Sequence, residues 1–345
     1  MNKTPDIIKN EKELHELLTT PNQMLIDFMK ELEGDLIILG IAGKMGVDLG
    51  ILAKKAAKLA GVDKKVIGVA RFSNPDAKTE LEDAGIETIS CDLLDPEAVS
   101  KLPNCKNVIY MAAKKFGTQG DESMTWAMNT LVPGYVARHF KESRIVVFST
   151  GCVYPLADSV EGGSTEDITP NPIGDYAMSC MGREMMFNYG SKQWGTEICQ
   201  FRLNYSVDLR YGVLHDIAQK ILNNEVVDLN SSHFNVIWQG DACSQAILCL
   251  GQCSNPPNIM NITGPELASV KLTAEKLANH MNKKVTFSGT PGGKTYLNNS
   301  EKATALFGYP KYNIDTLIKW QAHWVLNGNK SLGKATKFEV TNGKF

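Results

Sequence analysis

The sequence predicts an α/β protein built on a doubly wound parallel sheet, with a smaller lobe in its C-terminal part. Short apolar runs alternate with helical stretches from Asp35 onward, and these runs lack a two-residue alternation of polar and apolar side chains. Such strands are typical of a parallel sheet whose two faces are both covered by helices. The expected strands span residues 36–39, 65–70, 87–90, 107–111, 144–149 and 197–202.

Three regions follow one another along the chain. Residues 1–33 are expected to form an amphipathic helical extension, with a helix start at Thr20 followed by Pro21. We expect this extension to serve packing or a dimer contact. Residues 34–203 carry the alternation of strands and helices. Residues 204–345 contain helices, short strands and Gly/Pro turns, so we expect a second lobe there, some of whose elements return to the sheet.

The composition argues against several classes of protein. The formal net charge of −2 and the lack of a dense Lys/Arg stripe give no reason to expect a nucleic-acid partner. The eight cysteines show no C-x-x-C pair and the six histidines no metal-ligand spacing, so we expect no metal site and a reducing compartment. We find neither an apolar run of about 18 residues nor a signal-peptide-like start, which predicts a cytoplasmic protein with no membrane partner.

A glycine-rich turn follows the first expected strand. Gly40 allows a tight turn, Gly43 lets the backbone approach a pyrophosphate, and Gly46 lets the next helix pack close to the strand. The N-terminus of that helix points backbone N–H groups at an anion. The sequence therefore predicts a Rossmann-type domain that binds a dinucleotide. The residues expected at its phosphates are Gly40, Gly43, Lys44, Met45 and Gly46.

The end of the second expected strand distinguishes NAD from NADP. An acidic residue at this position binds the 2′-hydroxyl of the adenine ribose of NAD. This chain has Ala70 there, followed by Arg71. A guanidinium suits a 2′-phosphate by its charge and by its fork of donors. The sequence thus favours NADP over NAD, the alternative being that Arg71 only stacks on the adenine.

Further segments, in order, resemble the extended short-chain dehydrogenase/reductase superfamily, which includes the nucleotide-sugar epimerases and dehydratases. Asp92-Leu93 resembles the acidic-Leu pair at the adenine, residues 108–113 resemble the strand-four motif with Tyr110 in place of its usual His, and Asn129 resembles a helix Asn of this fold. The resemblance runs from about Asp35 to Gly308. The further cofactor contacts that it implies are Asp92, Leu93, Ala112, Ala113, Lys114, Asn129 and Tyr176.

The same resemblance implies a catalytic pair. Residues 148–155 resemble the Ser/Thr-rich strand end of the family, and alignment on Val153-Tyr154 places Thr150 at the catalytic Ser/Thr position. The segment from Thr165 to Pro172 leads into Tyr176 as it does in the family. There, a Tyr moves the hydroxyl proton of the substrate beside the nicotinamide, and a Ser/Thr hydroxyl holds the substrate oxygen. Tyr176 is thus the expected acid/base and Thr150 its partner.

The chain departs from the family at the lysine that follows the tyrosine by four residues. This lysine holds the nicotinamide ribose and lowers the pKa of the tyrosine, which matters because a free phenol has a pKa of about 10. Cys180 stands at this position, while Glu184 further along still fits the family pattern. A cysteine supplies neither the positive charge nor the hydrogen bonds of an ammonium group.

Three hypotheses account for the missing lysine. In the first, another cation replaces it, with Lys114 or Lys115 after the strand-four motif ahead of Arg183, which lies two helical turns beyond Tyr176. In the second, Tyr176 works without a cation, or the substrate and another acid/base move the proton. In the third, catalysis is lost and the chain binds NADP(H) as a sensor or scaffold.

The residues that bind a diphosphate in nucleotide-sugar enzymes of the family are replaced here. Phe234 stands at one usual Arg position, and the segment before Glu301 offers Lys294 but no Arg. Gly151-Cys152 replaces the Asp-Glu pair of the 4,6-dehydratases. We therefore expect a smaller sugar-like substrate. The residues expected to contact it are Thr150, Cys152, Asn204 and Tyr205.

Together these features predict an NAD(P)-dependent oxidoreductase or epimerase that acts on a secondary hydroxyl or keto group of a sugar-like substrate, bound partly by the second lobe. Both reaction types need the same residues and cofactor, so the motifs do not separate them. The alternative is a non-catalytic NADP(H)-binding regulator or scaffold. The resemblance to the family also implies a homodimer.

Overall fold

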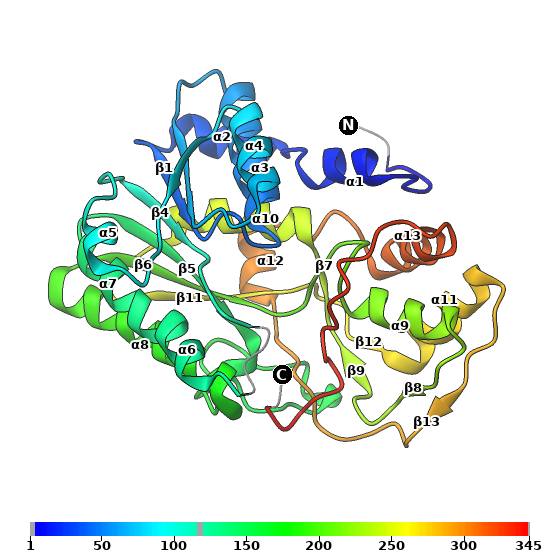
Figure 1. Cartoon of the computed structure of the whole chain (residues 1–345). Coiled ribbons are helices and arrows are strands. Elements are labelled where there is room, and N and C mark those ends of the chain that lie inside the picture. The colour runs from blue at the N-terminus through cyan, green and yellow to red at the C-terminus, as the bar shows by residue number, and fades with distance from the viewer. Residues whose placement is uncertain (1–3, 116–119, 344–345) are drawn as a thin grey trace.

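The computed structural model describes residues 4–115 and 120–343, and a parallel sheet forms its centre (Figure 1). Within these residues, seven strands lie in the order β11-β6-β5-β4-β1-β2-β3, and every neighbouring pair is parallel. This confirms the predicted fold class. The strands are β1 (Leu36–Leu39), β2 (Val66–Ala70), β3 (Glu87–Ser90), β4 (Asn107–Tyr110), β5 (Arg144–Thr150), β6 (Glu197–Leu203) and β11 (Asn258–Ile262).

Helices cover both faces of this sheet, and the side chains of β1 show why. Leu36 and Ile38 point into a core shared with α2, α3 and α10, whereas Ile37 and Leu39 point into a second core shared with α5, α7 and α8. All four are fully buried, and burying an aliphatic side chain contributes about 1.5–3 kcal/mol. The helices around the sheet are α2 (Gln23–Glu31), α3 (Gly46–Leu59), α4 (Pro75–Asp83), α5 (Pro96–Ser100), α6 (Glu122–Trp126), α7 (Val132–His139), α8 (Gly174–Trp194), α10 (Gln239–Leu248) and α12 (Glu301–Phe307).

The N-terminal extension consists of two helices, α1 (Glu11–Leu18) and α2. The helix start expected at Thr20-Pro21 is wrong, because α2 is capped by Asn22, whose Oδ1 accepts a hydrogen bond of 2.8 Å from the backbone N–H of Leu25. The Thr20 hydroxyl instead donates to the Glu16 carbonyl at the end of α1. Helix α1 packs on the second lobe and α2 on the sheet, so the extension joins both bodies.

The second lobe has its own core, on the right of Figure 1. At its centre the Trp238 ring lies 5.7 Å from Trp320 and 5.9 Å from Tyr312, measured between centroids. Phe234, which stands at the usual Arg position, is also buried in this core. The elements of the lobe are α9 (Val213–Leu222), α11 (Val270–Met281), α13 (Ile314–Leu326), β7 (Ser206–Val207), β8 (Val227–Asp228), β9 (His233–Phe234), β10 (Ile237–Trp238), β12 (Ala268–Ser269) and β13 (Phe287–Ser288).

All eight cysteines of the chain lie in the described residues and none forms a disulfide bond. Within the same residues, no His, Cys, Asp and Glu side chains gather in a group that could hold a metal ion. No described helix combines the length and the apolar character needed to cross a bilayer.

Candidate active site

The strand order reverses between β1 and β4, and ligands of open α/β sheets bind at the carboxyl ends of the strands at such a point. A cavity of about 230 Å³ opens there, between the ends of β1, β4, β5 and β6 and the second lobe. A second cavity of about 380 Å³ lies toward β2 and β3 and shares Gly40, Gly43, Met111 and Ala113 with the first. The two cavities together form an elongated site across the edge of the sheet.

The glycine turn lies where the two cavities meet. Gly40 has a φ of +89°, and a Cβ there would lie 2.7 Å from the backbone nitrogen of Ala112. At Gly46 a Cβ would lie 2.2 Å from the carbonyl oxygen of Ile41. Both positions thus require glycine. Because no side chain stands at either position, the N-terminus of α3 stays open to an anion, as the predicted phosphate site needs.

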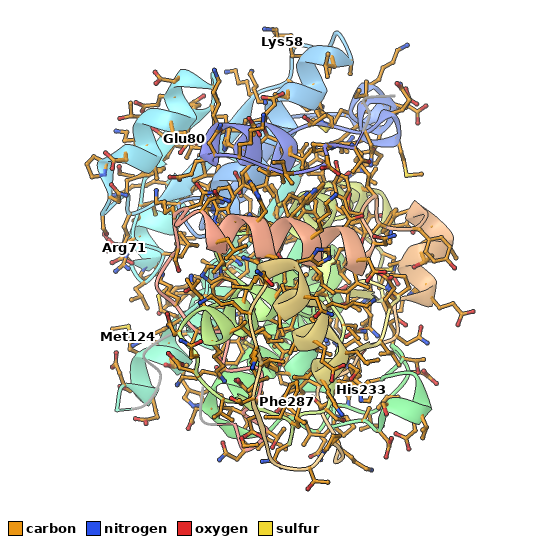
Figure 2. All side chains as sticks on the ribbon, turned by 90° about the vertical axis from the view of Figure 1, so that its right-hand side faces the viewer. Lys58, Arg71, Glu80, Met124, His233 and Phe287 are labelled. Carbon is orange, nitrogen blue, oxygen red and sulfur yellow. The ribbon has the colours of Figure 1, made fainter. Side chains whose placement is uncertain are left out.

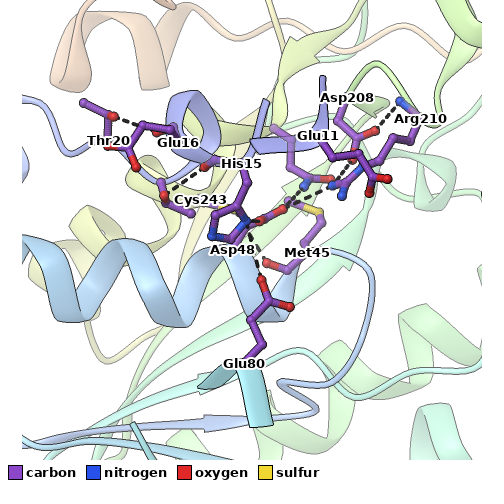
Figure 3. A network of polar contacts seen from close by, with 12 residues as sticks. Glu11, His15, Glu16, Thr20, Met45, Asp48, Glu80, Asp208, Arg210 and Cys243 are labelled. Atoms are coloured by element: carbon purple, nitrogen blue, oxygen red, sulfur yellow. Dashed lines mark hydrogen bonds and ion pairs between the residues drawn. The ribbon is translucent and has the colours of Figure 1, made fainter. Parts of the chain in front are cut away.

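A polar network fixes this end of α3 from behind (Figure 3). The buried Asp48 carboxylate in the first turn of α3 lies 3.2 Å from Nδ1 of His15 and 3.6 Å from Nη2 of Arg210, and accepts a hydrogen bond of 2.7 Å from Gln239. The hydrogen bond with Asp48 is the main reason why the pKa of His15 is raised. Sequence motifs gave no signal for this network, since its members come from four separate regions of the chain.

The second cavity is lined by residues expected at the adenosine half of the cofactor. Arg71 follows β2 and is exposed at the periphery of the molecule (Figure 2), and Asp92 and Leu93 follow β3. Ala112 and Ala113, after β4, lie on the opposite side from Arg71 along the sheet. The described lining carries no carboxylate at the end of β2 and a guanidinium instead.

The first cavity contains the expected catalytic pair. Thr150 ends β5 and Tyr176 lies in the first turn of α8, and both are buried in its lining. Burial raises the pKa of the Tyr176 phenol well above its ordinary value, whereas the Arg183 charge and a side-chain hydrogen bond with Thr150 act in the opposite direction. The phenol is therefore protonated at neutral pH and is placed to donate a proton or a hydrogen bond to a ligand oxygen.

The structure ranks the three candidate replacement cations differently from the sequence, which favoured Lys114 and Lys115 over Arg183. Lys114 does not line either cavity, because its ammonium group pairs with Asp121 on the outer side. Lys115 lines the first cavity, where its charge lowers the pKa of the Cys152 thiol against the larger effect of burial. Arg183, which we expected to be the weakest candidate, lines the same cavity, and its charge lowers the pKa of Tyr176 against the larger effect of burial.

Arg183 is held by backbone and side-chain groups rather than by a carboxylate. Its Nη1 donates to the carbonyl oxygen of Phe148 at 2.6 Å, and its Nη2 donates to Oδ1 of Asn129 at 3.0 Å. Asn129 in turn donates to Ser179 and to the backbone of Lys114, so it lies behind the cavity wall and does not line it. The expected cofactor residue Asn129 is thus placed to position Arg183.

The cysteine at the lysine position is fully buried beside Tyr176. Burial raises the pKa of the Cys180 thiol, and Cys180 does not line either cavity. Since a thiolate and not a thiol is the nucleophile, burial disfavours the reactive form of Cys180. Cys152 does line the first cavity, and burial likewise raises the pKa of its thiol.

Lys44 extends from the glycine turn toward the second lobe. Its ammonium nitrogen lies 3.7 Å from the ring centroid of Tyr211, a favourable cation–π arrangement. Burial lowers the pKa of Lys44 to about 8. Met45 and Gly46 next to it also line the first cavity, as do Asn204 and Tyr205 from the end of β6. Three further lining residues without a sequence signal are Ser206, Tyr211 and Thr336.

A buried ion pair holds the strand ends below the cavity. Nε and Nη2 of Arg202 on β6 donate to the Glu184 carboxylate on α8 at 2.9 and 2.7 Å, and both side chains are almost fully buried. Ser149 on β5 donates to the same carboxylate. The pair therefore ties β5, β6 and α8 together next to Thr150.

Replacing Arg202 by Met is expected to lower the free energy of unfolding by about 3–5 kcal/mol, because the Glu184 carboxylate would stay buried without its partner. Urea unfolding followed by circular dichroism measures this loss. Lys276→Met is the matched control, since Lys276 pairs with Asp315 at the surface and such pairs contribute about 0–1 kcal/mol. Equal losses in the two variants would contradict the role of the buried pair.

A glycine turn at the switch point of a doubly wound sheet defines a Rossmann-type α/β protein, and here a buried Tyr/Thr pair lies next to that turn. More closely, the chain belongs to the NAD dependent epimerase/dehydratase family, whose model matches residues 11–221. No curated protein matches the chain.

Solved structures share the fold at low sequence identity. MoeE5 in complex with UDP-glucuronic acid and NAD has a TM-score of 0.67 and 18% identity, over 86% of this chain and 100% of that chain. A UDP-glucuronic acid 4-epimerase from Bacillus cereus, in complex with a fluorinated UDP-glucuronic acid and NAD, has a TM-score of 0.68 and 18% identity, over 84% and 98%. The UDP-glucose 4-epimerase from Thermotoga maritima, with UDP-glucose, has a TM-score of 0.67 and 16% identity, over 84% and 98%.

Proposed function

We propose that this protein is an NAD(P)-dependent oxidoreductase or epimerase that acts on a secondary hydroxyl or keto group of a compact, sugar-like substrate. The observation that carries the proposal is the Tyr176–Thr150 pair, buried in a cavity that begins at the glycine turn. Membership of a family of NAD-dependent epimerases and dehydratases supports the same class of reaction.

The chain's own groups have distinct roles in this proposal. The nicotinamide, when bound, supplies or takes up a hydride at the substrate carbon. Thr150 holds the substrate oxygen, and Tyr176 gives its phenolic proton to that oxygen in reduction or takes the hydroxyl proton in oxidation. Because Tyr176 has a raised pKa, the protein must favour its phenolate during oxidation, and the charge of Arg183 acts in that direction.

The residues present suit a dinucleotide. Gly40, Gly43 and Gly46 would leave room for the phosphates, and the adenosine would lie in the second cavity, whose lining includes Arg71. The solved neighbours hold NAD, so the preference for NADP depends on Arg71 alone. We nevertheless propose NADP as the better-fitting cofactor, since a 2′-phosphate would pair with the exposed guanidinium.

We propose a compact substrate because the first cavity is small, with a volume of about 230 Å³, and because polar groups line it. Its lining includes polar side chains from the end of β5 and from the segment after β6, namely Thr150, Asn204 and Ser206. Hydroxyl and amide groups both donate and accept hydrogen bonds, so they suit a ligand rich in hydroxyl groups. The solved neighbours bind UDP-linked sugars, but Phe234 replaces one usual phosphate ligand of such enzymes and lies in the core.

A non-catalytic NADP(H)-binding regulator is the second candidate. Two observations favour it, namely Cys180 at the position of the catalytic lysine and the raised pKa of Tyr176. The cytoplasmic location and the homodimeric state that we expect from the sequence remain predictions.

Titration of the purified protein with NAD, NADH, NADP and NADPH, followed by nicotinamide fluorescence, tests which cofactor is bound. Turnover on free sugars, sugar acids and polyols tests the proposed reaction. A retained cofactor would indicate an epimerase and an exchangeable one a dehydrogenase or reductase. Tight binding without turnover on any substrate would favour the regulator, and no binding at all would overturn the proposal.

Replacing Gly46 by Ala is expected to weaken cofactor binding by about tenfold or more, equivalent to about 1.4 kcal/mol, because the new Cβ displaces the start of α3. The fluorescence titration measures the change. Gly292→Ala is the control, since a Cβ there meets no atom within 4 Å. An unchanged affinity in Gly46→Ala would place the phosphates elsewhere.

Replacing Arg71 by Ala is expected to weaken NADPH by about ten- to a hundredfold and to leave NADH unchanged, since a charge-assisted hydrogen bond contributes about 1.5–3 kcal/mol. The same titration measures both cofactors. Lys58→Ala removes an exposed charge at the far end of α3 (Figure 2) and is the control. Equal weakening of NADH and NADPH would show that Arg71 stacks on the adenine instead.

A further inference from the structure

After α13 the chain does not end in the second lobe but returns across the boundary between the lobe and the sheet (Figure 1). We call residues 330–343 the strap. In Figure 1 it is the red trace that runs from α13 between α9 and the strands to the neighbourhood of α6 and α8. Its residue Thr336 lines the cavity that contains Tyr176 and Thr150.

The first half of the strap is bound to the second lobe by specific contacts. The backbone N–H of Leu332 donates to the carbonyl oxygen of Arg210 at 3.0 Å, and Ser331 Oγ lies 2.8 Å from Nε2 of His215. Thr336 donates through its N–H and its hydroxyl to the Asp216 carboxylate, at 2.7 and 2.5 Å. Thr336 is thus held at the cavity wall by a carboxylate on α9.

The next residues anchor the strap in the core of the lobe. Phe338 is only 2% exposed, and its ring centroid lies 6.2 Å from that of Phe234. The Glu339 carboxylate pairs with Lys220 on α9 at 2.5 Å. The strap is therefore anchored in the lobe both by a buried ring and by an ion pair.

The far end of the strap lies against the start of α8, the helix that carries Tyr176. A Cβ at Gly343 would lie 2.5 Å from the carbonyl oxygen of Ile173, and a Cβ at Gly174 would lie 2.4 Å from the carbonyl oxygen of Gly343. Ile173 is the N-cap of α8, and Tyr176 lies in its first turn. The strap thus spans from the second lobe to the helix that carries Tyr176.

We infer that the strap determines the substrate class of this site: it closes the lobe side of the cavity, admits a compact hydroxyl or keto compound, and excludes a sugar linked to a nucleoside diphosphate. The inference depends on the proposed function, because it takes the cavity beside Tyr176 as the substrate site.

The test compares two glycine variants of the strap. In Gly343→Ala the new Cβ clashes with Ile173 and lifts the end of the strap from α8. Gly333→Ala is the matched control, because Gly333 also has a positive φ, of +62°, but a Cβ there meets no atom within 4 Å. Phe338→Ala, which removes the buried anchor, is the second strap variant.

Three measurements are made on the full-length proteins: trypsin cleavage at the exposed Lys334 and Lys337, cofactor binding by fluorescence, and UDP-glucose binding to the cofactor-loaded protein by calorimetry. We expect Gly343→Ala and Phe338→Ala to be cleaved faster and to bind UDP-glucose at least about tenfold more tightly than the wild type, a change of about 1.4 kcal/mol. Gly333→Ala should behave as the wild type does.

The inference is overturned if the strap variants are cleaved faster but bind UDP-glucose no better, or if the wild type already binds it as tightly as they do. Equal cleavage rates in all variants also overturn it, because the contacts described above would then not hold the strap. If neither the wild type nor any variant binds the cofactor, the proposed function itself is refuted. This result is distinct from the outcomes above, which overturn only the role of the strap.

Discussion

Tyr176→Phe is expected to lower kcat by about 10²–10⁴-fold, the usual contribution of a positioned acid/base, while cofactor affinity stays nearly unchanged. The substitution removes only the phenolic oxygen, whose proton has to move for the hydride transfer to be completed. Steady-state kinetics measures the loss of turnover, and the fluorescence titration measures the affinity for the cofactor. The ring itself remains and keeps its packing in the cluster around Cys152 and Cys180.

Tyr189→Phe is the matched control, because Tyr189 lies on the same helix with 58% of its surface exposed. Intact turnover in Tyr176→Phe would show that the catalytic site has been assigned wrongly. A loss of cofactor binding together with turnover would show instead that the hydroxyl is needed to maintain the structure of the site.

Replacing Arg183 by Gln is expected to move the pH dependence of kcat/KM for alcohol oxidation to higher pH. A nearby positive charge stabilises the Tyr176 phenolate, so its removal raises a pKa that burial has already raised. Each pH unit of that shift lowers the phenolate fraction, and hence the rate on the acidic side of the profile, by about tenfold. The rate of oxidation between about pH 6 and pH 10 is the measurement.

Two further variants make the Arg183 result specific. Arg183→Lys retains the charge and should restore most of the original pH profile, and Lys115→Gln tests the competing cation in the same cavity. A shift in Lys115→Gln but not in Arg183→Gln would show that Lys115 replaces the missing lysine. Urea unfolding of each variant separates this effect from the loss of the hydrogen bonds to Phe148 and Asn129.

The strands of the sheet could be predicted from the sequence because they are compact apolar runs. Five of the six expected strands begin at the residue observed, and β2 begins one residue later than expected. Strand β11 (Asn258–Ile262) gave no such signal, because it lies at the edge of the sheet, contains two asparagines and is reached only after the chain has passed through β7 to β10. Its pairing with β6 depends on a long-range return that no local pattern encodes.

The candidate site could be predicted only where a motif carries it. The glycine turn, Thr150 and Tyr176 lie together because their spacing to the strand ends is fixed by the fold. The cations could not be ranked, since neighbouring positions say nothing about where a long side chain points: Lys114 turns outward to Asp121, and Arg183 is directed by Asn129. Thr336 has no motif and is 160 residues from Tyr176.

The network behind the glycine turn also has a consequence for how the protein folds. Asp48 is bonded to Gln239, which lies 191 residues further along the chain, and Arg210 reaches it from a third region. Closing such long loops costs chain entropy before any contact repays it, and contacts of this kind form slowly. A nascent chain that has emerged only as far as β6 therefore has the strands around the glycine turn and the contact of His15 with Asp48, but it lacks the bonds that Arg210 and Gln239 make to Asp48. The phosphate-binding end of that helix is completed only when more than two thirds of the polypeptide has been made.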